Sequence, residues 1–324
     1  MTSMWVRVNG IGHAFCRELG CPCDRCRIVS PDFALPTPAV EAPREFPGWD
    51  DPPWRAHTSA SLFVCDDGGA VQGHVLIDVG AGVVDSLASS GLTGTEKLTA
   101  VVLTHWHPDH VLGLNQLCES VKRHRSGEFR KVPFYCTLPT YEVLRSKSYS
   151  YEMDNFLQYH EVVPCLDFEV DVPDYRGVSM RMTPVPVAHG NVKGAVIYAV
   201  QLANKKVVFC WDIDVPGASG PRNVRTNLRV IRDHVEALRQ PDLLFMASNT
   251  WRKVTNADGR ATGHTSYELA QQYIEAIGPK RVLLVHLSGH EDSRGAGWGW
   301  RDRDWDKAAS PAAKAARQGM VIGL

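Results

Sequence analysis

The chain has 324 residues, 44% hydrophobic and 22% charged, an ordinary composition for a globular protein with a large core. A formal net charge of −1 provides no overall basic field and argues against a nucleic-acid partner. No apolar run approaches the roughly 18 residues that cross a bilayer, and no signal-peptide pattern opens the sequence. We therefore expect a cytoplasmic protein with no membrane partner, whose nine cysteines are reduced.

Short apolar runs and helical patterns alternate along the chain. Strands are predicted at Trp5–Val8, Ser61–Val64, His74–Val79, Ala100–Leu103, Val132–Cys136, Met180–Val187, Ala195–Leu202, Lys206–Trp211, Leu243–Ala247, Arg281–His286 and Met320–Leu324, with a turn at Asn204. Helices are predicted at about 110–123, 139–148, 224–239 and 266–277, the last with a capping box from Thr265 to Glu268 and a stop at Gly278. Stretches 31–56 and 291–309 are irregular loops. The mixed order predicts one α/β domain over residues 1–324.

A cysteine-rich segment at about 16–26 predicts a structural metal site. Cys21, Cys23 and Cys26 form a C-x-C-x-x-C pattern, which fits three corners of a tetrahedral zinc site. His290 is the first candidate for the fourth ligand, because one loop could then serve both this site and His286. Cys16 is the second candidate, and a redox pair of Cys23 with Cys26 is a minor alternative.

Four possible metal ligands occupy six residues directly after the predicted strand Ala100–Leu103: His105, His107, Asp109 and His110. Imidazoles with a carboxylate suit zinc or a neighbouring transition metal. Four ligands so close together exceed what one catalytic ion needs if it is to keep a position open for water. The spacing therefore indicates two adjacent ions.

Three further strand ends carry possible ligands. His189 follows Met180–Val187, Asp212 follows Lys206–Trp211, and His286 ends Arg281–His286. Each is a weak signal alone, but with the first cluster they form a series in which every ligand lies at the end of a strand.

In this order the residues resemble the signature of the metallo-β-lactamase-fold hydrolases, H-x-H-x-D-H followed by a distant His, a bridging Asp and a final His. The resemblance implies an αββα sandwich of two mixed sheets flanked by helices. It also implies one ion on His105, His107 and His189, a second on Asp109, His110 and His286, and Asp212 bridging both. Asp214 competes with Asp212 for the bridge, and Asp78 resembles the buried aspartate that orients the first cluster.

The residue at the second position of the cluster, His107, indicates which branch of the fold the chain resembles. The flavin-diiron branch of the fold carries Glu where this chain has His107, so nitrogen ligation here favours a hydrolytic, zinc-type site. The cysteine segment makes the chain most similar to the PhnP-type phosphodiesterases. The pyrroloquinoline quinone biosynthesis B proteins share that zinc but largely lack the histidine cluster. One departure is that the two late histidines, His286 and His290, are four residues apart here and three apart in the PhnP pattern.

Further candidates lie beyond the ligands, of which His264 follows from the same resemblance and the others from the residues themselves. His264, just before a predicted helix, is the candidate general acid, and Asp109 is counted as catalytic as well as a ligand. His13 is a candidate substrate contact. Trp298 and Trp300 could stack on a substrate ring, although packing of their loop is the simpler explanation.

The predicted function is hydrolysis of a small cyclic or nucleotide-like phosphodiester by a hydroxide shared between two zinc or manganese ions, with one structural zinc elsewhere. The alternative on the same ligands is lactone, thioester or β-lactam hydrolysis. An RNA-processing nuclease of the tRNase Z kind and a non-catalytic binding protein are weaker alternatives. The expected partner is a small-molecule phosphate ester, and a homodimer stays an open alternative.

Overall fold

The computed structural model describes residues 2–12, 56–89, 98–124, 131–147, 149–173, 175, 177–213, 222–252, 264–288, 300, 304, 307–308 and 313–324. Several predicted sites lie outside these residues. They are the cysteine segment with Cys16, Cys21, Cys23 and Cys26, the single candidates His13, Asp214, His290 and Trp298, and nearly all of stretches 31–56 and 291–309.

The described strands form two seven-stranded sheets. The strands of the first sheet are β1 (Ser3–Gly10), β2 (Ser59–Cys65), β3 (Val71–Ile77), β4 (Leu98–Val102), β5 (Val132–Cys136), β6 (Leu157–Glu161) and β14 (Val321–Gly323). The strands of the second sheet are β7 (Phe168–Asp171), β8 (Ser179–Pro186), β9 (Val196–Leu202), β10 (Lys205–Cys210), β11 (Leu243–Ala247), β12 (Val282–Val285) and β13 (Ala313–Ala315).

Both sheets are mixed. The first has the order β14-β1-β2-β3-β4-β5-β6, antiparallel as far as β3 and parallel from β3 to β6. The second has the order β13-β12-β11-β10-β9-β8-β7, parallel from β13 to β10 and antiparallel beyond. The predicted turn at Asn204 is confirmed, because β9 and β10 pair as a hairpin with Leu202 opposite Lys205.

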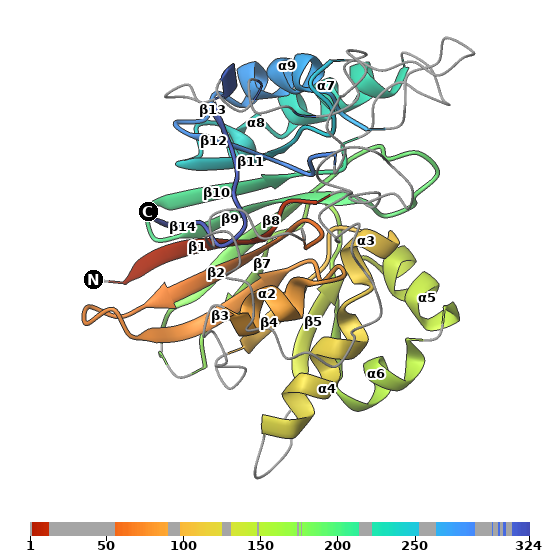
Figure 1. Ribbon diagram of the computed structural model, residues 1–324, viewed down its shortest axis with the longest axis vertical. Helices are drawn as coiled ribbons and strands as arrows, with labels where there is room; N and C mark the ends of the chain where they lie inside the picture. Colours follow the sequence, from red (N-terminus) through yellow and green to blue (C-terminus); the bar gives the residue numbers. More distant parts are fainter. Residues whose placement is uncertain are drawn as a thin grey trace, which may run out of the picture.

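Helices cover the outer face of each sheet (Figure 1). They are α2 (Val83–Ser89), α3 (Pro108–Val111), α4 (Leu114–His124), α5 (Leu138–Ser146), α6 (Ser150–Asn155), α7 (Arg222–Asp233), α8 (Val235–Leu238) and α9 (Tyr267–Ile277). The helices α7, α8 and α9 lie beside the second sheet, whereas α2, α4, α5 and α6 lie beside the first. The expected αββα sandwich of two mixed sheets is therefore confirmed. No described helix combines the length and apolar composition that crossing a membrane requires.

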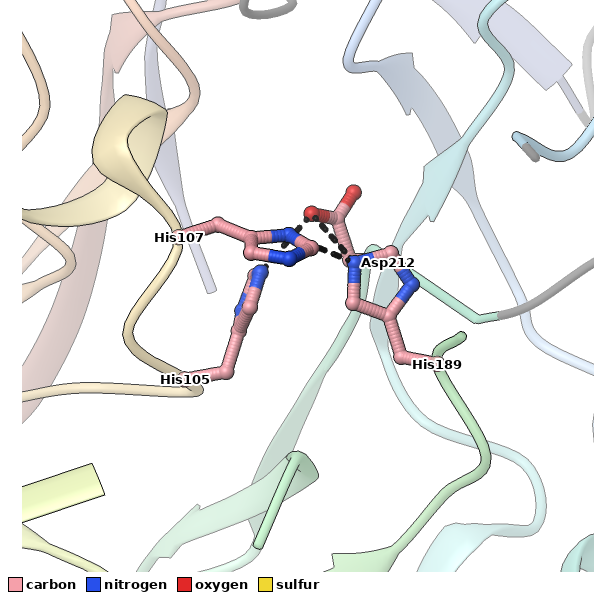
Figure 2. Close-up of side chains that lie close together, drawn as sticks. All are labelled: His105, His107, His189 and Asp212. Carbon is pink, nitrogen blue, oxygen red and sulfur yellow. Dashed lines mark hydrogen bonds and ion pairs between the residues drawn. The ribbon is translucent and has the colours of Figure 1, made fainter. Parts of the chain in front are cut away.

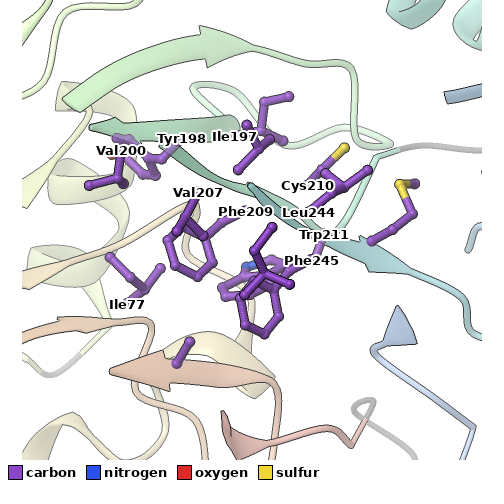
Figure 3. Close-up of a cluster of buried hydrophobic side chains, with 14 of the residues drawn as sticks. Ile77, Ile197, Tyr198, Val200, Val207, Phe209, Cys210, Trp211, Leu244 and Phe245 are labelled. Carbon is purple, nitrogen blue, oxygen red and sulfur yellow. The ribbon is translucent and has the colours of Figure 1, made fainter. Parts of the chain in front are cut away.

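The core between the sheets is built from alternate strand residues. Along β1, Val6 and Val8 are fully buried in this core, while Arg7 lies on the opposite face against α2, where it bonds to Ser86. Aromatic side chains of the second sheet fill much of the space (Figure 3). Phe209 stacks on Phe245 with ring centroids 5.1 Å apart. A second core lies between the first sheet and its covering helices.

Three predicted helices differ in the structure. The helix predicted at 224–239 is divided at His234 into α7 and α8. The helix predicted at 110–123 is interrupted at Gly113, whose N–H donates to the Val79 carbonyl at 2.8 Å. A side chain at Gly113 would lie 2.5 Å from the Gly80 carbonyl oxygen, so the chain turns where two backbone segments touch. The cap of α9 is Ser266, which accepts from Leu269 N–H at 3.4 Å, and not Thr265.

Candidate metal centre

The predicted dinuclear ligands converge at the carboxyl ends of strands from both sheets. In the first sheet, β4 leads into the loop that carries His105 and His107 and then into α3, which carries Asp109 and His110. In the second sheet, β8, β10 and β12 are followed within a few residues by His189, Asp212 and His286. The sheets pack with these strand ends together, so His105 and His107 of the first sheet lie beside His189 and Asp212 of the second (Figure 2). Asp109 and His286 also meet, 177 positions apart in the sequence.

The seven side chains form two groups that share one carboxylate. Within each group, one ligand atom from each residue lies within 4.8 Å of every other. The first group is His105, His107, His189 and Asp212, and the second is Asp109, His110, Asp212 and His286. All of these residues are buried except His107, which is half-buried. The structure therefore brings all seven predicted side chains together, in two groups that share Asp212.

These polar atoms fit a metal ion better than they fit one another. Among the described residues, His105 Nε2, His110 Nε2 and both carboxylate oxygens of Asp212 are buried without a hydrogen bond. Asp212 Oδ2 nevertheless lies 3.2 Å from His105 Nε2 and 2.9 Å from His110 Nε2. Buried polar atoms that converge without hydrogen bonds carry a desolvation cost, which a shared cation would remove. Five imidazoles and two carboxylates are a donor set for zinc or a neighbouring divalent metal.

The protonation states also suit metal binding. Burial disfavours the imidazolium form and lowers the pKa of His107 to about 4 and that of His189 to about 2, which leaves both neutral at pH 7. Burial alone would raise the pKa of Asp109, but His110 and His286 beside it hold that pKa well below its ordinary value. Asp212 is held ionised in the same way by His286 and His110.

The pKa values of two histidines of the second group, His286 and His110, are raised instead of lowered. Burial would lower the pKa of His286, but Asp212 and Asp109 outweigh it and raise that pKa to about 9. The pKa of His110 is likewise raised well above its ordinary value, because Asp212, Asp109 and Asp78 outweigh burial. The centre thus concentrates negative charge that a proton or a divalent cation can neutralise.

Asp78 orients histidines of both groups, as expected from the sequence. Its carboxylate is fully buried and accepts from Thr104 N–H at 2.8 Å, Thr104 Oγ1 at 2.6 Å and His110 Nδ1 at 2.8 Å. Since the Thr104 hydroxyl proton is directed to Asp78, its oxygen is left to accept from His105 Nδ1 at 3.1 Å. Both imidazoles therefore present Nε2 to the centre.

Three residues at strand ends have left-handed backbone conformations. They are Asp78 with φ 57°, Asp212 with φ 54° and His286 with φ 58°. This conformation is uncommon outside glycine, and Asp and His are among the residues that tolerate it best. In each case the backbone turns out of the strand at the residue that belongs to the centre. Local strain of this kind is typical of functional sites.

His264 lies beside both groups. Its ring centroid is 5.1 Å from that of His286 and 6.1 Å from that of His189. Burial lowers its pKa to about 4. It lies three residues before the first residue of α9, and the N-terminus of a helix favours bound anions. The structure thus places His264, the predicted general acid, next to the candidate metal ligands His286 and His189.

The structure also places two further side chains, His57 and Trp300. His57, which had no predicted role, borders the second group, and its Nδ1 accepts from Ala81 N–H at 3.1 Å. Trp300 is only 1% exposed, donates to the Ser248 carbonyl at 2.9 Å and contacts the Trp251 ring edge-on. The simpler explanation, packing, is therefore confirmed for Trp300, which is not an exposed stacking platform. No local pattern distinguishes His57 from the other scattered histidines.

Comparisons with known proteins agree with this geometry. A ribonuclease Z from Bradyrhizobium sp. (strain ORS 278) is 38% identical over 245 residues, which are 66% of this chain and 80% of that protein. An octanoyltransferase from Porphyromonas gingivalis is 24% identical over 239 residues, which are 72% of this chain, and the chain spans only 40% of that protein. The crystal structure of a diphosphatase from the PhnP family superposes with a TM-score of 0.63 at 20% identity, covering 100% of this chain and 98% of that one.

The family match covers the whole candidate centre. The model described as the beta-lactamase superfamily domain matches residues 74–287, which include every ligand from His105 to His286 as well as Asp78 and His264. This fold carries divalent metal ions, and the two groups of His and Asp side chains lie where such ions would bind. The chain belongs to the beta-lactamase superfamily and has the fold of its metal-dependent hydrolases.

Proposed function

We propose that this protein is a dinuclear metal-dependent phosphodiesterase that cleaves a small cyclic or nucleotide-like phosphodiester. The observation that carries the proposal is the pair of four-residue groups that share Asp212, because two ions held so close can act on one substrate. Zinc- or manganese-class ions bound there would supply a water-derived nucleophile at neutral pH and neutralise charge on the phosphate. One ion would be held by His105, His107 and His189, the other by Asp109, His110 and His286, with Asp212 between them.

His264 is the proposed proton donor to the leaving oxygen. It is the one described histidine that contacts both groups without being a member of either. Its imidazole is neutral before substrate enters, because burial lowers its pKa to about 4. An anionic phosphate bound beside it would favour the imidazolium form, which can then release a proton to the leaving group.

The ribonuclease Z and PhnP-family matches support phosphate chemistry over carboxyl chemistry. The relative at 38% identity is named a ribonuclease, and the superposed PhnP-family structure is titled a diphosphatase, so both act on phosphate linkages. The same ligands could polarise a carbonyl in a lactone, thioester or β-lactam, which makes those substrates the necessary comparison in the assay.

RNA is a second candidate substrate. The ribonuclease Z match favours it, contrary to the expectation from net charge, because a local basic surface can bind RNA on a protein that is neutral overall. An RNA with an unpaired 3′ extension on a tRNA-like stem therefore belongs in the assay beside the small phosphodiesters.

Turnover by the purified protein loaded with zinc or manganese tests the proposal. We expect hydrolysis of bis(p-nitrophenyl) phosphate or a 2′,3′-cyclic nucleotide, and none of a lactone or a β-lactam at the same enzyme concentration. The variant His189→Ala should lose the activity. His160→Ala is the matched control, because His160 stacks on Tyr135 and belongs to neither group. Lactone or β-lactam turnover without phosphodiester turnover would reject the proposal.

The cysteine segment is proposed to bind a structural zinc through Cys21, Cys23, Cys26 and His290, with Cys16 as the other candidate for the fourth ligand. The protein should then contain close to three zinc-class ions per chain by elemental analysis. Cys23→Ser should lower that content by one without emptying the dinuclear centre. A content near two that Cys23→Ser leaves unchanged would exclude the structural site.

A further inference from the structure

A side-chain hydrogen bond between the two sheets reaches the carboxylate that orients the ligand histidines. The indole Nε1 of Trp211 donates to Asp78 Oδ2 at 2.8 Å, across a sequence separation of 133 residues. Trp211 follows β10 in the second sheet and immediately precedes Asp212, whereas Asp78 follows β3 in the first sheet. Each sheet thus contributes one partner at the position where its chain turns into the centre.

The Trp211 ring is held rigidly from the side of the second sheet. Only 1% of the residue is exposed, and its ring meets Phe209 at 5.2 Å and Phe245 at 6.1 Å, both edge-on (Figure 3). The apolar body therefore packs in the core between the sheets, while the polar edge is directed at Asp78. A buried indole N–H requires an acceptor, and here the acceptor is the carboxylate that orients the ligand histidines.

Asp78 Oδ2 accepts three hydrogen bonds at once, from Trp211, Thr104 and His110. The Trp211 bond restrains the carboxylate that holds His110 Nδ1, and it also offsets part of the negative charge on that carboxylate. The proton between His110 and Asp78 is then kept on the imidazole, with Nε2 turned toward Asp212 Oδ2 at 2.9 Å. Asp212 is the residue next to Trp211. The Trp211 side chain therefore influences both the Asp212 carboxylate and His110, which faces it.

We infer that Trp211 is a positioning residue for the metal centre, which clamps Asp78 of the first sheet to the Asp212 turn of the second. The inference rests on the proposed function only in requiring that divalent ions bind at this centre. Partners that orient metal ligands typically contribute about 10- to 100-fold to metal affinity. Trp211 acts through Asp78 and touches no ion, so we place its effect at the lower end of that range.

The test is Trp211→Phe, which keeps an aromatic ring and removes the N–H. We expect the dissociation constant for zinc, measured by competition with a chromophoric chelator, to rise about tenfold, and the visible spectrum of the Co²⁺-loaded protein to change. Trp300→Phe is the matched control, since it removes an indole N–H of equal burial that donates to a backbone carbonyl. The control should leave zinc affinity and the cobalt spectrum at wild-type values.

Unchanged zinc affinity and an unchanged cobalt spectrum in Trp211→Phe would overturn the inference, whatever the protein hydrolyses. Failure of the wild-type protein to cleave phosphodiesters while it binds ions would overturn the proposed function alone. If Trp211→Phe does not fold, the wild-type ¹⁵N-indole resonance of Trp211 gives the answer. It should shift when zinc is added, and a resonance that does not respond to zinc would reject the clamp.

Discussion

Gly80→Ala tests how closely the metal centre depends on backbone packing. Gly80 lies between β3 and α2, and a Cβ built on it would lie 2.0 Å from the Asp109 carbonyl oxygen and 2.4 Å from His57 Cβ. Contacts under 3.0 Å are essentially never seen for a real Cβ, so the backbone at Asp109 must move by at least about 1 Å. Asp109 and His110 lie in α3, so this movement changes their position relative to Asp212 and His286.

This displacement has two measurable consequences. Overpacking of this size destabilises a protein by about 1–3 kcal/mol, which urea denaturation of the metal-free protein would measure. A metal site needs its ligands within about 0.5 Å of their proper geometry, and a 1 Å error can lower turnover about 100-fold. We therefore expect Gly80→Ala to lose the ion held by the second group and most activity, while keeping its fold by circular dichroism.

The control is Gly68→Ala, on the exposed hairpin between β2 and β3. A Cβ built on Gly68 would have the end of the Asp66 side chain as its nearest neighbour, at 3.3 Å, so a methyl group fits with little adjustment. Stability and metal content should match the wild type. If Gly80→Ala also binds two ions with wild-type affinity, the close packing of α3 against Gly80 is not what positions Asp109 and His110, and the reasoning is wrong.

Three further predictions follow from the centre and the core. Asp212→Asn should lower metal content by at least one ion per chain, measured by elemental analysis, because both groups include this carboxylate; retention of two ions would contradict its shared role. His264→Asn should lower kcat by about 10²–10⁴-fold with metal content unchanged, and equal kcat would remove it as the acid. Burial lowers the pKa of His74 from 6.5 to about 3, so the folded state binds its proton less readily than the unfolded chain. His74 should therefore destabilise the metal-free protein by about 1.4 kcal/mol per pH unit as pH falls from 6.5 towards 3. Urea denaturation should show a weaker acid dependence in His74→Gln, and an identical pH profile would refute this.

The ligand positions could be predicted from sequence because each is local to a strand end. The run Ala100–Leu103 before His105 is recognisable without tertiary information, as are the apolar strands before His189 and Asp212. Their division into two groups came from the family resemblance, and the structure brings the same residues together. The strands missed in the prediction have weak patterns: β6 and β7 are edge strands with polar residues, and β13 has only three residues. The missed helices α2 and α6 are short, with seven and six residues.

Other features had no sequence signal because they depend on contacts between distant segments. His57 borders the second group, although nothing around it in the sequence indicates a site. The break at Gly113 follows from its contact with Gly80, 33 residues earlier. The cap of α9 is Ser266, whereas the hydroxyl of Thr265 donates to the Ile213 carbonyl at 2.7 Å, a contact between distant segments.

The sequence by itself indicated an α/β domain and a metal centre, because strand periodicity and ligand type are properties of short segments. The αββα sandwich and the hydrolytic chemistry were implied by the family resemblance. Only the tertiary structure decided how those ligands are oriented. Asp78 holds His110 and is held in turn by Trp211, 133 residues away on the other sheet. Such a contact exists only after the two sheets pack, since burial removes water as a competing partner and directs each polar group to the one acceptor or donor within reach.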